Sequence, residues 1–335
     1  MPDSNDIILE IRDLKMHFPV KKGLFSRTVG QVRAVDGVSL KIRRGETVGL
    51  VGESGCGKST LGRCVIRLYD PTEGRIFFNG RDISQAGPAE MRALRKDMQI
   101  IFQDPNESLN SRHSVEEILE EPFIIHDVGS PEERRIWIRQ LLSRVGLPES
   151  AAERYPHEFS GGQRQRIGIA RAIALKPKLI VCDEAVSALD VSIQSQVLNL
   201  LMDLQDEMNL TYIFIAHGLP VVKLISDRIA VMYLGKVVEF TSSQRIYDAP
   251  QHPYTQALIS AIPEADPEHR TERIILQGDV PSPINPPSGC AFHPRCRFAT
   301  ERCKKESPQF RQLGNDEHWV ACHHAGELVA TSSES

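Results

Sequence analysis

The sequence predicts an α/β fold built on a mostly parallel sheet, and three short apolar segments carry this prediction. Residues 46–51, 179–182 and 212–216 each have the composition of a buried strand. Apolar strands without polar alternation are typical of parallel strands that helices cover on both faces. Ligands of such open sheets usually bind at the carboxyl ends of the strands. We therefore expect the functional residues to follow these three segments.

Other segments of regular pattern surround these strands. Residues 8–18, 34–42 and 74–78 favour antiparallel β structure, and residues 134–145 have helical spacing. Many more residues separate Lys58 from Asp183, near the ends of the first two strands, than a simple crossover needs. We therefore predict an insertion between them, and the helical spacing indicates that the insertion is helical.

The composition describes a globular protein with room for one large domain or two. Of 335 residues, 41% are hydrophobic and 25% are charged, which excludes a fibre or a disordered chain. The net charge of −4 argues against a nucleic-acid partner. No stretch approaches 18 consecutive apolar residues, and the first residues do not resemble a signal peptide. We expect a cytosolic chain that does not itself cross a membrane.

The strand at 46–51 runs into a phosphate-binding motif. Residues 52–59, Gly-Glu-Ser-Gly-Cys-Gly-Lys-Ser, fit G-x-x-x-x-G-K-[ST] in full. In this motif glycines turn backbone N–H groups towards phosphate oxygens, Lys58 supplies charge to the β/γ-phosphates, and Ser59 offers a hydroxyl to Mg²⁺. The helix that follows adds its positive N-terminal end. The predicted nucleotide-binding residues are Gly52, Ser54, Gly55, Cys56, Gly57, Lys58, Ser59 and Thr60.

The strand at 179–182 ends in two carboxylates that complement the phosphate loop. Asp183 is placed to hold the Mg²⁺ shell, and Glu184 to accept a proton from an attacking water. Alone, an Asp-Glu pair after an apolar strand is more often a solvated strand end. Together with residues 52–59 it favours a catalytic site.

Between these two sites, residues 159–166, Phe-Ser-Gly-Gly-Gln-Arg-Gln-Arg, resemble the signature motif of ATP-binding-cassette (ABC) ATPases, with Phe where Leu is commoner. Four further landmarks of that family follow its order along the chain, and the resemblance covers about residues 8–245. They are an aromatic residue placed to stack on adenine, Phe18; the Q-loop, Gln103; the D-loop, Asp190; and the switch histidine, His217.

This resemblance implies a P-loop ABC ATPase core with an antiparallel β subdomain and an inserted helical subdomain at about 104–172. The family binds ATP and Mg²⁺, which here implies Ser59, Gln103 and Asp183 as the metal shell. Glu184 would polarise the attacking water, and His217 would contact the γ-phosphate and help hold Glu184.

The same resemblance implies that two such subunits face head to tail. Each signature, here Ser160, Gly161, Gly162 and Gln163, would close over the partner's ATP. Two positions depart from the pattern: Ala185 stands where Pro usually follows the glutamate, and Gly218 stands where Asp usually follows the histidine. Neither removes a catalytic group, so we expect an active site.

The C-terminal part differs in composition. It holds ten of the 21 prolines between residues 250 and 308, and four of the seven cysteines in the last 46 residues. Residues 252–258, 278–287 and 289–296 resemble the tail of ATPase subunits of dipeptide and oligopeptide importers, most nearly the second, F-type subunit. We therefore predict an ABC nucleotide-binding domain at 1–250 and a small Cys-rich region of the peptide-importer type at 251–335.

Four tail cysteines form a candidate metal centre: Cys290, Cys296, Cys303 and Cys322. Four thiolates can bind one tetrahedral metal or one cubane cluster, and the spacing alone separates these options poorly. In a cytosolic chain clustered cysteines favour metal binding over disulfides. The subfamily resemblance implies a [4Fe–4S] cluster. Zn²⁺ and reduced structural thiols are the alternatives, and His293, His323 or His324 could replace a ligand.

Taken together, the resemblance implies an ATP-hydrolysing subunit that powers peptide import. Its implied partners are a homologous D-type ATPase in a heterodimer, two transmembrane permease subunits and an extracytoplasmic peptide-binding protein, without nucleic acid. Its implied location is peripheral, on the cytoplasmic face of the inner (plasma) membrane.

Three alternatives stay open. They are an importer of another solute such as nickel or glutathione, a regulatory and weakly hydrolysing partner, and a soluble ABC ATPase that acts on DNA or ribosomes. The intact Lys58, Asp183 and Glu184 speak against the regulatory partner. The sequence contains no second cassette, long coiled coil or basic surface, which speaks against the soluble ATPase.

Overall fold

The computed structural model describes residues 6–22, 27–104, 108–216, 218–262, 273–314 and 317–327. Its contacts divide the chain into two compact units. The first unit comprises Met1–Leu9, Ile42–Thr47 and Phe78–Ile215. The second unit comprises Glu10–Lys41, Val48–Phe77 and Ala216–Ser335. Each unit therefore joins segments that lie far apart in the sequence.

In the first unit, strands β6 (Met98–Ile101), β7 (Leu179–Asp183) and β8 (Thr211–Ile215) lie side by side in that order. Both pairs are parallel, with Ile101 opposite Cys182 and Asp183 opposite Ile215. Every residue of β7 and β8 is buried, as expected for parallel strands covered on both faces. The two predicted strands of this unit are confirmed.

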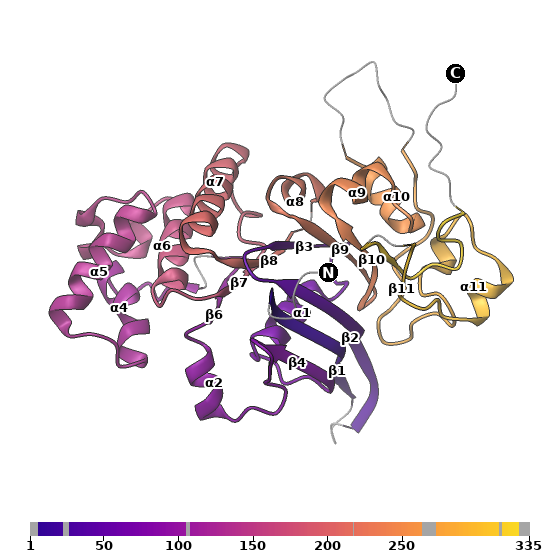
Figure 1. Cartoon of the computed structure of the whole chain (residues 1–335), viewed down its shortest axis with the longest axis horizontal. Coiled ribbons are helices and arrows are strands. Elements are labelled where there is room, and N and C mark those ends of the chain that lie inside the picture. Colours follow the sequence, from indigo (N-terminus) through magenta and orange to yellow (C-terminus); the bar gives the residue numbers. More distant parts are fainter. Residues whose placement is uncertain are drawn as a thin grey trace, which may run out of the picture. The chain divides into compact units, whose positions relative to one another are not determined.

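Helices fill the insertion between β6 and β7. In Figure 1, α4, α5 and α6 form one group, and they contact one another. Ser114 and Ser130 begin α4 and α5 with capping boxes, because each hydroxyl accepts the N–H of a glutamate three residues on. The predicted helical insertion is confirmed. The helices and short strand of this unit are β5 (Arg81–Asp82), α2 (Pro88–Leu94), α4 (Val115–Ile125), α5 (Pro131–Arg144), η2 (Glu149–Glu153), η3 (Pro156–Glu158), α6 (Gly161–Ile173) and α7 (Val191–Met208).

In the second unit the strand order is β11-β12-β10-β9-β3. Strand β3 pairs with β9 in parallel, whereas β9, β10, β12 and β11 pair antiparallel. The C-terminal strands thus extend this mixed sheet at one edge, so the tail is part of the second unit. Its elements are β3 (Thr47–Val51), α1 (Lys58–Val65), α8 (Leu219–Ile225), β9 (Arg228–Tyr233), β10 (Lys236–Ser242), α9 (Ser243–Asp248), α10 (Pro253–Ser260), η4 (His293–Arg295), α11 (Glu301–Lys305), β11 (Arg311–Gln312) and β12 (Trp319–Val320).

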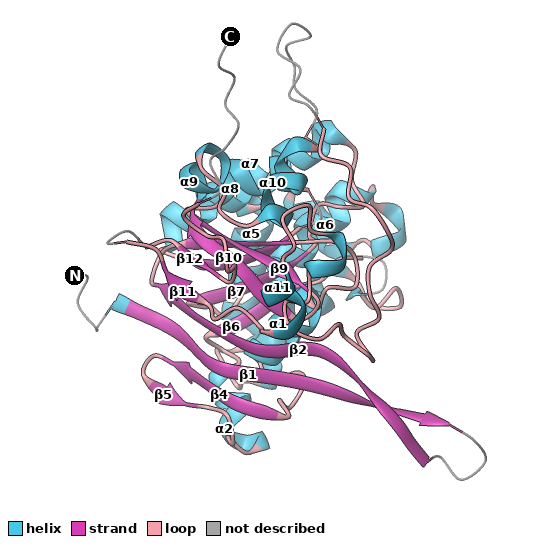
Figure 2. Ribbon diagram, turned by 90° about the vertical axis from the view of Figure 1, so that its right-hand side faces the viewer, coloured by secondary structure: helices cyan, strands magenta, loops and turns pink. Residues whose placement is uncertain are grey.

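The predicted antiparallel β subdomain contains β1 (Ile7–Lys22), β2 (Arg27–Arg43) and β4 (Glu73–Phe78), in the order β2-β1-β4. Figure 2 shows that β1 and β2 run together as two long strands. Both extend beyond the predicted limits at residues 18 and 34. Among the extra residues whose burial is described, exposed positions alternate with half-buried ones, but Pro19, Gly30 and several polar residues interrupt the apolar pattern by which a strand is recognised.

Candidate functional site

The phosphate-binding motif forms the turn between β3 and α1 in the second unit. Gly57 has a φ of 105°, and a Cβ built there would lie 1.9 Å from the carbonyl oxygen of Ala34. A Cβ on Gly52 would lie 2.2 Å from the carbonyl oxygen of Met232. Backbone on both sides therefore leaves no room for a side chain, which is the physical reason for glycine at these positions.

Lys58 begins α1 and points back into the loop. Its side chain is buried, and its ammonium donates to the carbonyl oxygens of Gly52 at 2.8 Å and Glu53 at 3.2 Å. Burial raises the pKa of the neighbouring Cys56 thiol, so this thiol stays neutral beside the lysine. Ser54 and Gly55 are exposed, and Ser59 and Thr60 lie in the first turn of α1.

Phe18 lies on β1, in the same unit as the phosphate loop. Its ring meets the ring of Tyr69 edge to face, with centroids 5.6 Å apart. The hydroxyl of Tyr69 accepts a hydrogen bond from Arg63 in α1 at 3.3 Å. Phe18 is therefore connected, through Tyr69, to the helix that follows the phosphate loop.

Asp183 is the last residue of β7 in the first unit, and Glu184 follows it directly. Both are nearly inaccessible, with 1% and 5% of their surface exposed. Glu184 has a φ of 54°, a left-handed conformation that non-glycine residues rarely adopt. Its N–H donates to the carbonyl of Ile215, and its carbonyl accepts from both the N–H and the hydroxyl of Ser187. Strained backbone of this kind is concentrated at functional positions.

Gln103 lies at the same edge of the first unit's sheet as these carboxylates. The parallel register places Ile101 opposite Cys182. Gln103 lies two residues after Ile101 and Glu184 two residues after Cys182, so both follow their strands at the same level. Gln103 is exposed. This agrees with the general position of ligand sites at the carboxyl ends of parallel strands.

The signature residues begin α6. Ser160 caps this helix: its hydroxyl accepts the N–H of Gln163, and the Gln163 side chain accepts the N–H of Ser160. Asp190 caps α7 by accepting the N–H of Ile193 at 2.9 Å. A Cβ on Gly162 would lie 2.5 Å from the Ile193 side chain, so the glycine lets the starts of α6 and α7 pack closely.

The predicted site residues therefore fall into two groups. The phosphate loop and Phe18 belong to the second unit, whereas Gln103, Asp183, Glu184, Asp190 and the signature belong to the first. The predicted switch histidine, His217, lies outside the described residues.

The phosphate loop has two further partners that the sequence did not single out. The N–H of Glu53 donates to the Tyr254 hydroxyl at 2.8 Å, and the Glu53 carboxylate accepts two hydrogen bonds from Arg295. Both partners come from the C-terminal part of the second unit. Only their placement in space identifies them, since about 200 residues or more separate them from Glu53.

The four tail cysteines lie in the second unit as free thiols, with Cys303 and Cys322 buried. The N–H of Cys290 donates to the carbonyl of Cys303 at 2.8 Å. Burial, with added repulsion from the neighbouring tail cysteines, raises the pKa of Cys296 to about 11 and that of Cys322 to about 12. Among the described residues, however, no group of three or more His, Cys, Asp or Glu side chains is arranged to hold a metal ion. The predicted metal centre is therefore not supported by this geometry.

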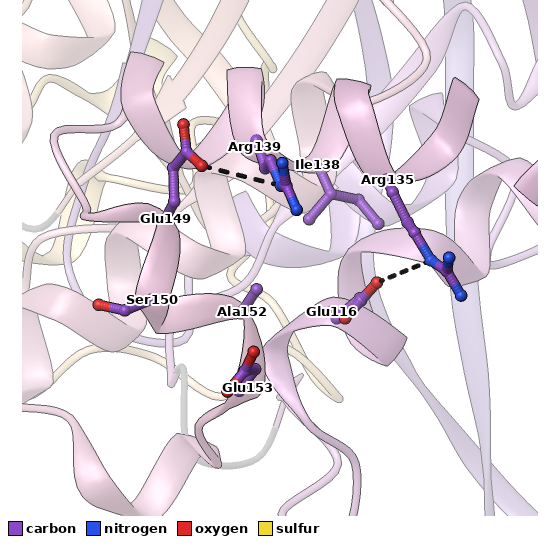
Figure 3. Close-up of a pocket in the computed structure, with 8 residues that line it drawn as sticks. All are labelled: Glu116, Arg135, Ile138, Arg139, Glu149, Ser150, Ala152 and Glu153. Carbon is purple, nitrogen blue, oxygen red and sulfur yellow. Dashed lines mark ion pairs between the residues drawn. The ribbon is translucent and has the colours of Figure 1, made fainter. Parts of the chain in front are cut away.

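A cavity of about 230 Å³ lies among the helices of the first unit (Figure 3). Two ion pairs line it, Arg135–Glu116 at 3.8 Å and Arg139–Glu149 at 3.7 Å. None of the predicted site residues lines this cavity. It is therefore separate from the candidate functional site.

Two known protein families match this chain. The model of the ABC transporter family matches residues 35–187, and that of the C-terminal region of oligopeptide/dipeptide transporters matches residues 238–303. The oligopeptide transport ATP-binding protein AppF of Bacillus subtilis is 56% identical, over 96% of this chain and 98% of that protein. The dipeptide transport ATP-binding protein DppF of Haemophilus influenzae is 51% identical, over 96% and 97%.

Solved structures agree with these relatives. A component of an ABC transporter complex from Clostridium perfringens superposes with a TM-score of 0.62 at 29% identity, over 73% of this chain and 92% of that chain. A dimeric ATP-binding cassette bound to ADP and phosphate has the same TM-score and identity, over 70% and 98%. Among the described residues, no helix combines the length and apolar character needed to cross a membrane. On the full-length likeness and the geometry of the phosphate loop, the chain belongs to the ABC ATP-binding proteins of oligopeptide and dipeptide transporters.

Proposed function

We propose that this chain binds and hydrolyses ATP to power the import of peptides through an ABC transporter. The observation that carries the proposal is the phosphate loop between β3 and α1. Relatives that match this chain over nearly their whole length are peptide transport ATP-binding proteins. The likeness includes the C-terminal region that is particular to oligopeptide and dipeptide transporters.

The roles of the site residues follow from their chemistry. The loop N–H groups and Lys58 bind the phosphates, and the buried ammonium exchanges its present carbonyl partners for phosphate oxygens. Glu184 takes the proton of the attacking water. Ser59, Gln103 and Asp183 would hold Mg²⁺, which neutralises developing phosphate charge when bound. His217 contacts the γ-phosphate, and Phe18 stacks on adenine.

The chain's surroundings complete the proposal. Residues 1–250 form the nucleotide-binding domain, with a helical subdomain at about 104–172, and residues 251–335 form the importer-type tail. The exposed signature residue Ser160 and the D-loop Asp190 face the ATP site of a homologous D-type subunit. This heterodimer binds two permease subunits at the cytoplasmic face of the membrane and receives peptides from an extracytoplasmic binding protein.

Reconstitution of the complex tests this function. We expect proteoliposomes with the ATPases, permease and binding protein to accumulate peptide only with ATP, and Lys58→Ala to abolish uptake because the phosphates lose their cation. Uptake of a labelled peptide and of nickel or glutathione is measured in parallel. ATP-dependent uptake of nickel or glutathione but not of peptide would reject peptide import and keep the ATPase assignment.

We further propose that the four tail thiols hold a [4Fe–4S] cluster when the chain is assembled under reducing conditions. Four thiolate ligands fit the needs of such a cluster. The Cys303 thiol lies 3.6 Å from the Nε2 atom of His324, and the N–H of Cys290 donates to the carbonyl of Cys303, so two of the four tail cysteines are neighbours. When bound, the cluster would hold together a region with little regular structure.

The metal content of anaerobically purified protein checks this proposal. We expect about four iron atoms per chain and loss of most of this iron in Cys322→Ser. Cys64→Ala, which removes a buried cysteine outside the tail, is the control and should keep the iron. One zinc per chain, or neither metal, would refute the cluster.

A further inference from the structure

Glu53, the second residue of the phosphate loop, is held at all three of its polar groups. Its N–H donates to the Tyr254 hydroxyl at 2.8 Å. Its carbonyl accepts a hydrogen bond from the Lys58 ammonium at 3.2 Å. Its carboxylate accepts from the Nη1 and Nη2 atoms of Arg295, at 2.7 and 3.0 Å. The loop is therefore tied to the tail at the residue next to Gly52.

The contact between Arg295 and Glu53 has the geometry of a strong ion pair. Both guanidinium nitrogens meet the two carboxylate oxygens, an arrangement that adds orientation as well as energy. The Arg295 side chain is only 7% exposed and that of Glu53 is 27% exposed, so water screens this pair less than a surface pair. Arg295 thus neutralises the carboxylate of a residue that belongs to the phosphate loop.

Arg295 is itself held in place by the segment between two tail cysteines, residues 290–296. Phe292 of this segment is 2% exposed. Its ring lies 5.2 Å from that of Tyr233 on β9 and 5.4 Å from that of Tyr254 on α10. The segment therefore packs on the same tyrosine that binds Glu53.

The start of α10 keeps Tyr254 in position. Burial lowers the pKa of His252 to about 3, so its ring is neutral. The Nδ1 atom of this ring accepts the N–H of Tyr254 at 3.1 Å. The Glu239 carboxylate accepts the N–H of His252 at 2.9 Å. The contacts from β10 to the phosphate loop thus form one continuous network, which is buried up to Tyr254 and partly buried at Glu53.

We propose that Arg295 is a positioning residue of the ATP site, through which the docked segment 290–296 holds the phosphate loop in the shape that receives ATP. Without Arg295, the Glu53 carboxylate is free to turn towards the phosphates and repels them. The loop also loses the contact that fixes its first turn. ATP affinity therefore depends on the C-terminal segment, although this segment is far from the motif in sequence.

The test measures MgATP binding by the full-length chain, with a fluorescent ATP analogue, and the KM and kcat for hydrolysis in the assembled complex. We expect Arg295→Ala to weaken binding about tenfold and to raise KM more than it lowers kcat. Arg295→Lys, which keeps the charge but not the paired donors, should lie between this variant and the wild type. The control is Arg297→Ala, an exposed arginine of the same stretch, which should bind ATP like the wild type.

A double-mutant cycle separates positioning from a general structural role. We expect the double variant Glu53→Gln/Arg295→Ala to bind ATP at least as well as Arg295→Ala alone, because both substitutions break the same contact and the first also removes the repelling carboxylate. Thermal unfolding without nucleotide checks that each variant is folded. If Arg295→Ala does not fold, Arg295→Lys alone and combined with Glu53→Gln provide the same comparison. Wild-type affinity in Arg295→Ala, or weaker binding by the double variant than by Arg295→Ala alone, would overturn the proposal.

Discussion

Glu184→Gln should lower ATP hydrolysis by about 10²-fold or more and leave ATP binding intact. The amide has nearly the shape of the carboxylate but cannot accept the proton of the attacking water. The strained backbone at Glu184 is held by hydrogen bonds to Ile215 and Ser187, which involve main-chain atoms of residue 184. The substitution leaves those bonds in place, so the effect isolates the side chain's chemistry.

Hydrolysis is measured in the assembled complex, and ATP binding by equilibrium titration of the same variant. Glu132→Gln, at an exposed position in the first turn of α5, is the matched control and should hydrolyse ATP at the wild-type rate. If the Glu184 variant turned over ATP as fast as the wild type, another group would have to be the base.

The second large effect is expected for Gly57→Ala, which should weaken ATP binding about 100-fold or more. An alanine there combines a φ of 105° with a Cβ only 1.9 Å from the Ala34 carbonyl oxygen. Because the obstacle is backbone, the loop must shift, and Lys58 shifts with it. A strain of about 3 kcal/mol in the binding-competent loop corresponds to this loss of affinity.

Gly55→Ala provides the comparison for this prediction. Gly55 also has a positive φ, 78°, but nothing lies within 4 Å of a Cβ built there. We expect a loss of about tenfold, the cost of the left-handed conformation alone. Titration with MgATP and thermal unfolding without nucleotide are measured for both. Equal affinities of the two alanine variants would show that the contact with Ala34 does not shape the loop.

The core of the fold follows from local sequence pattern. Residues 179–182 and 212–216 are apolar runs of strand length, which are typical of a strand covered on both faces, so β7 and β8 could be predicted. The long outer parts of β1 and β2 were not. Their residues are held by hydrogen bonds between the two strands and not by burial. Backbone hydrogen bonding requires no particular composition of either strand.

The candidate site shows the same division between local and distant causes. Phosphate and metal chemistry requires particular residues close together in the chain, here Gly57, Lys58 and the Asp183-Glu184 pair. Each can therefore be recognised as a motif. The left-handed backbone at Glu184 has no such signal, because it is held by a hydrogen bond that its N–H donates to Ile215 and by two that its carbonyl accepts from Ser187.

The amino-acid order alone specified the phosphate loop, the family's ordered motifs and the importer-type tail, because each depends on residues close together in the chain. Only the folded chain revealed that Ala34 and Met232 enclose the loop's glycines and that Arg295 and Tyr254 hold Glu53. These contacts join residues up to 242 positions apart. Packing and charge pairing act through space, so no spacing rule along the chain reports them.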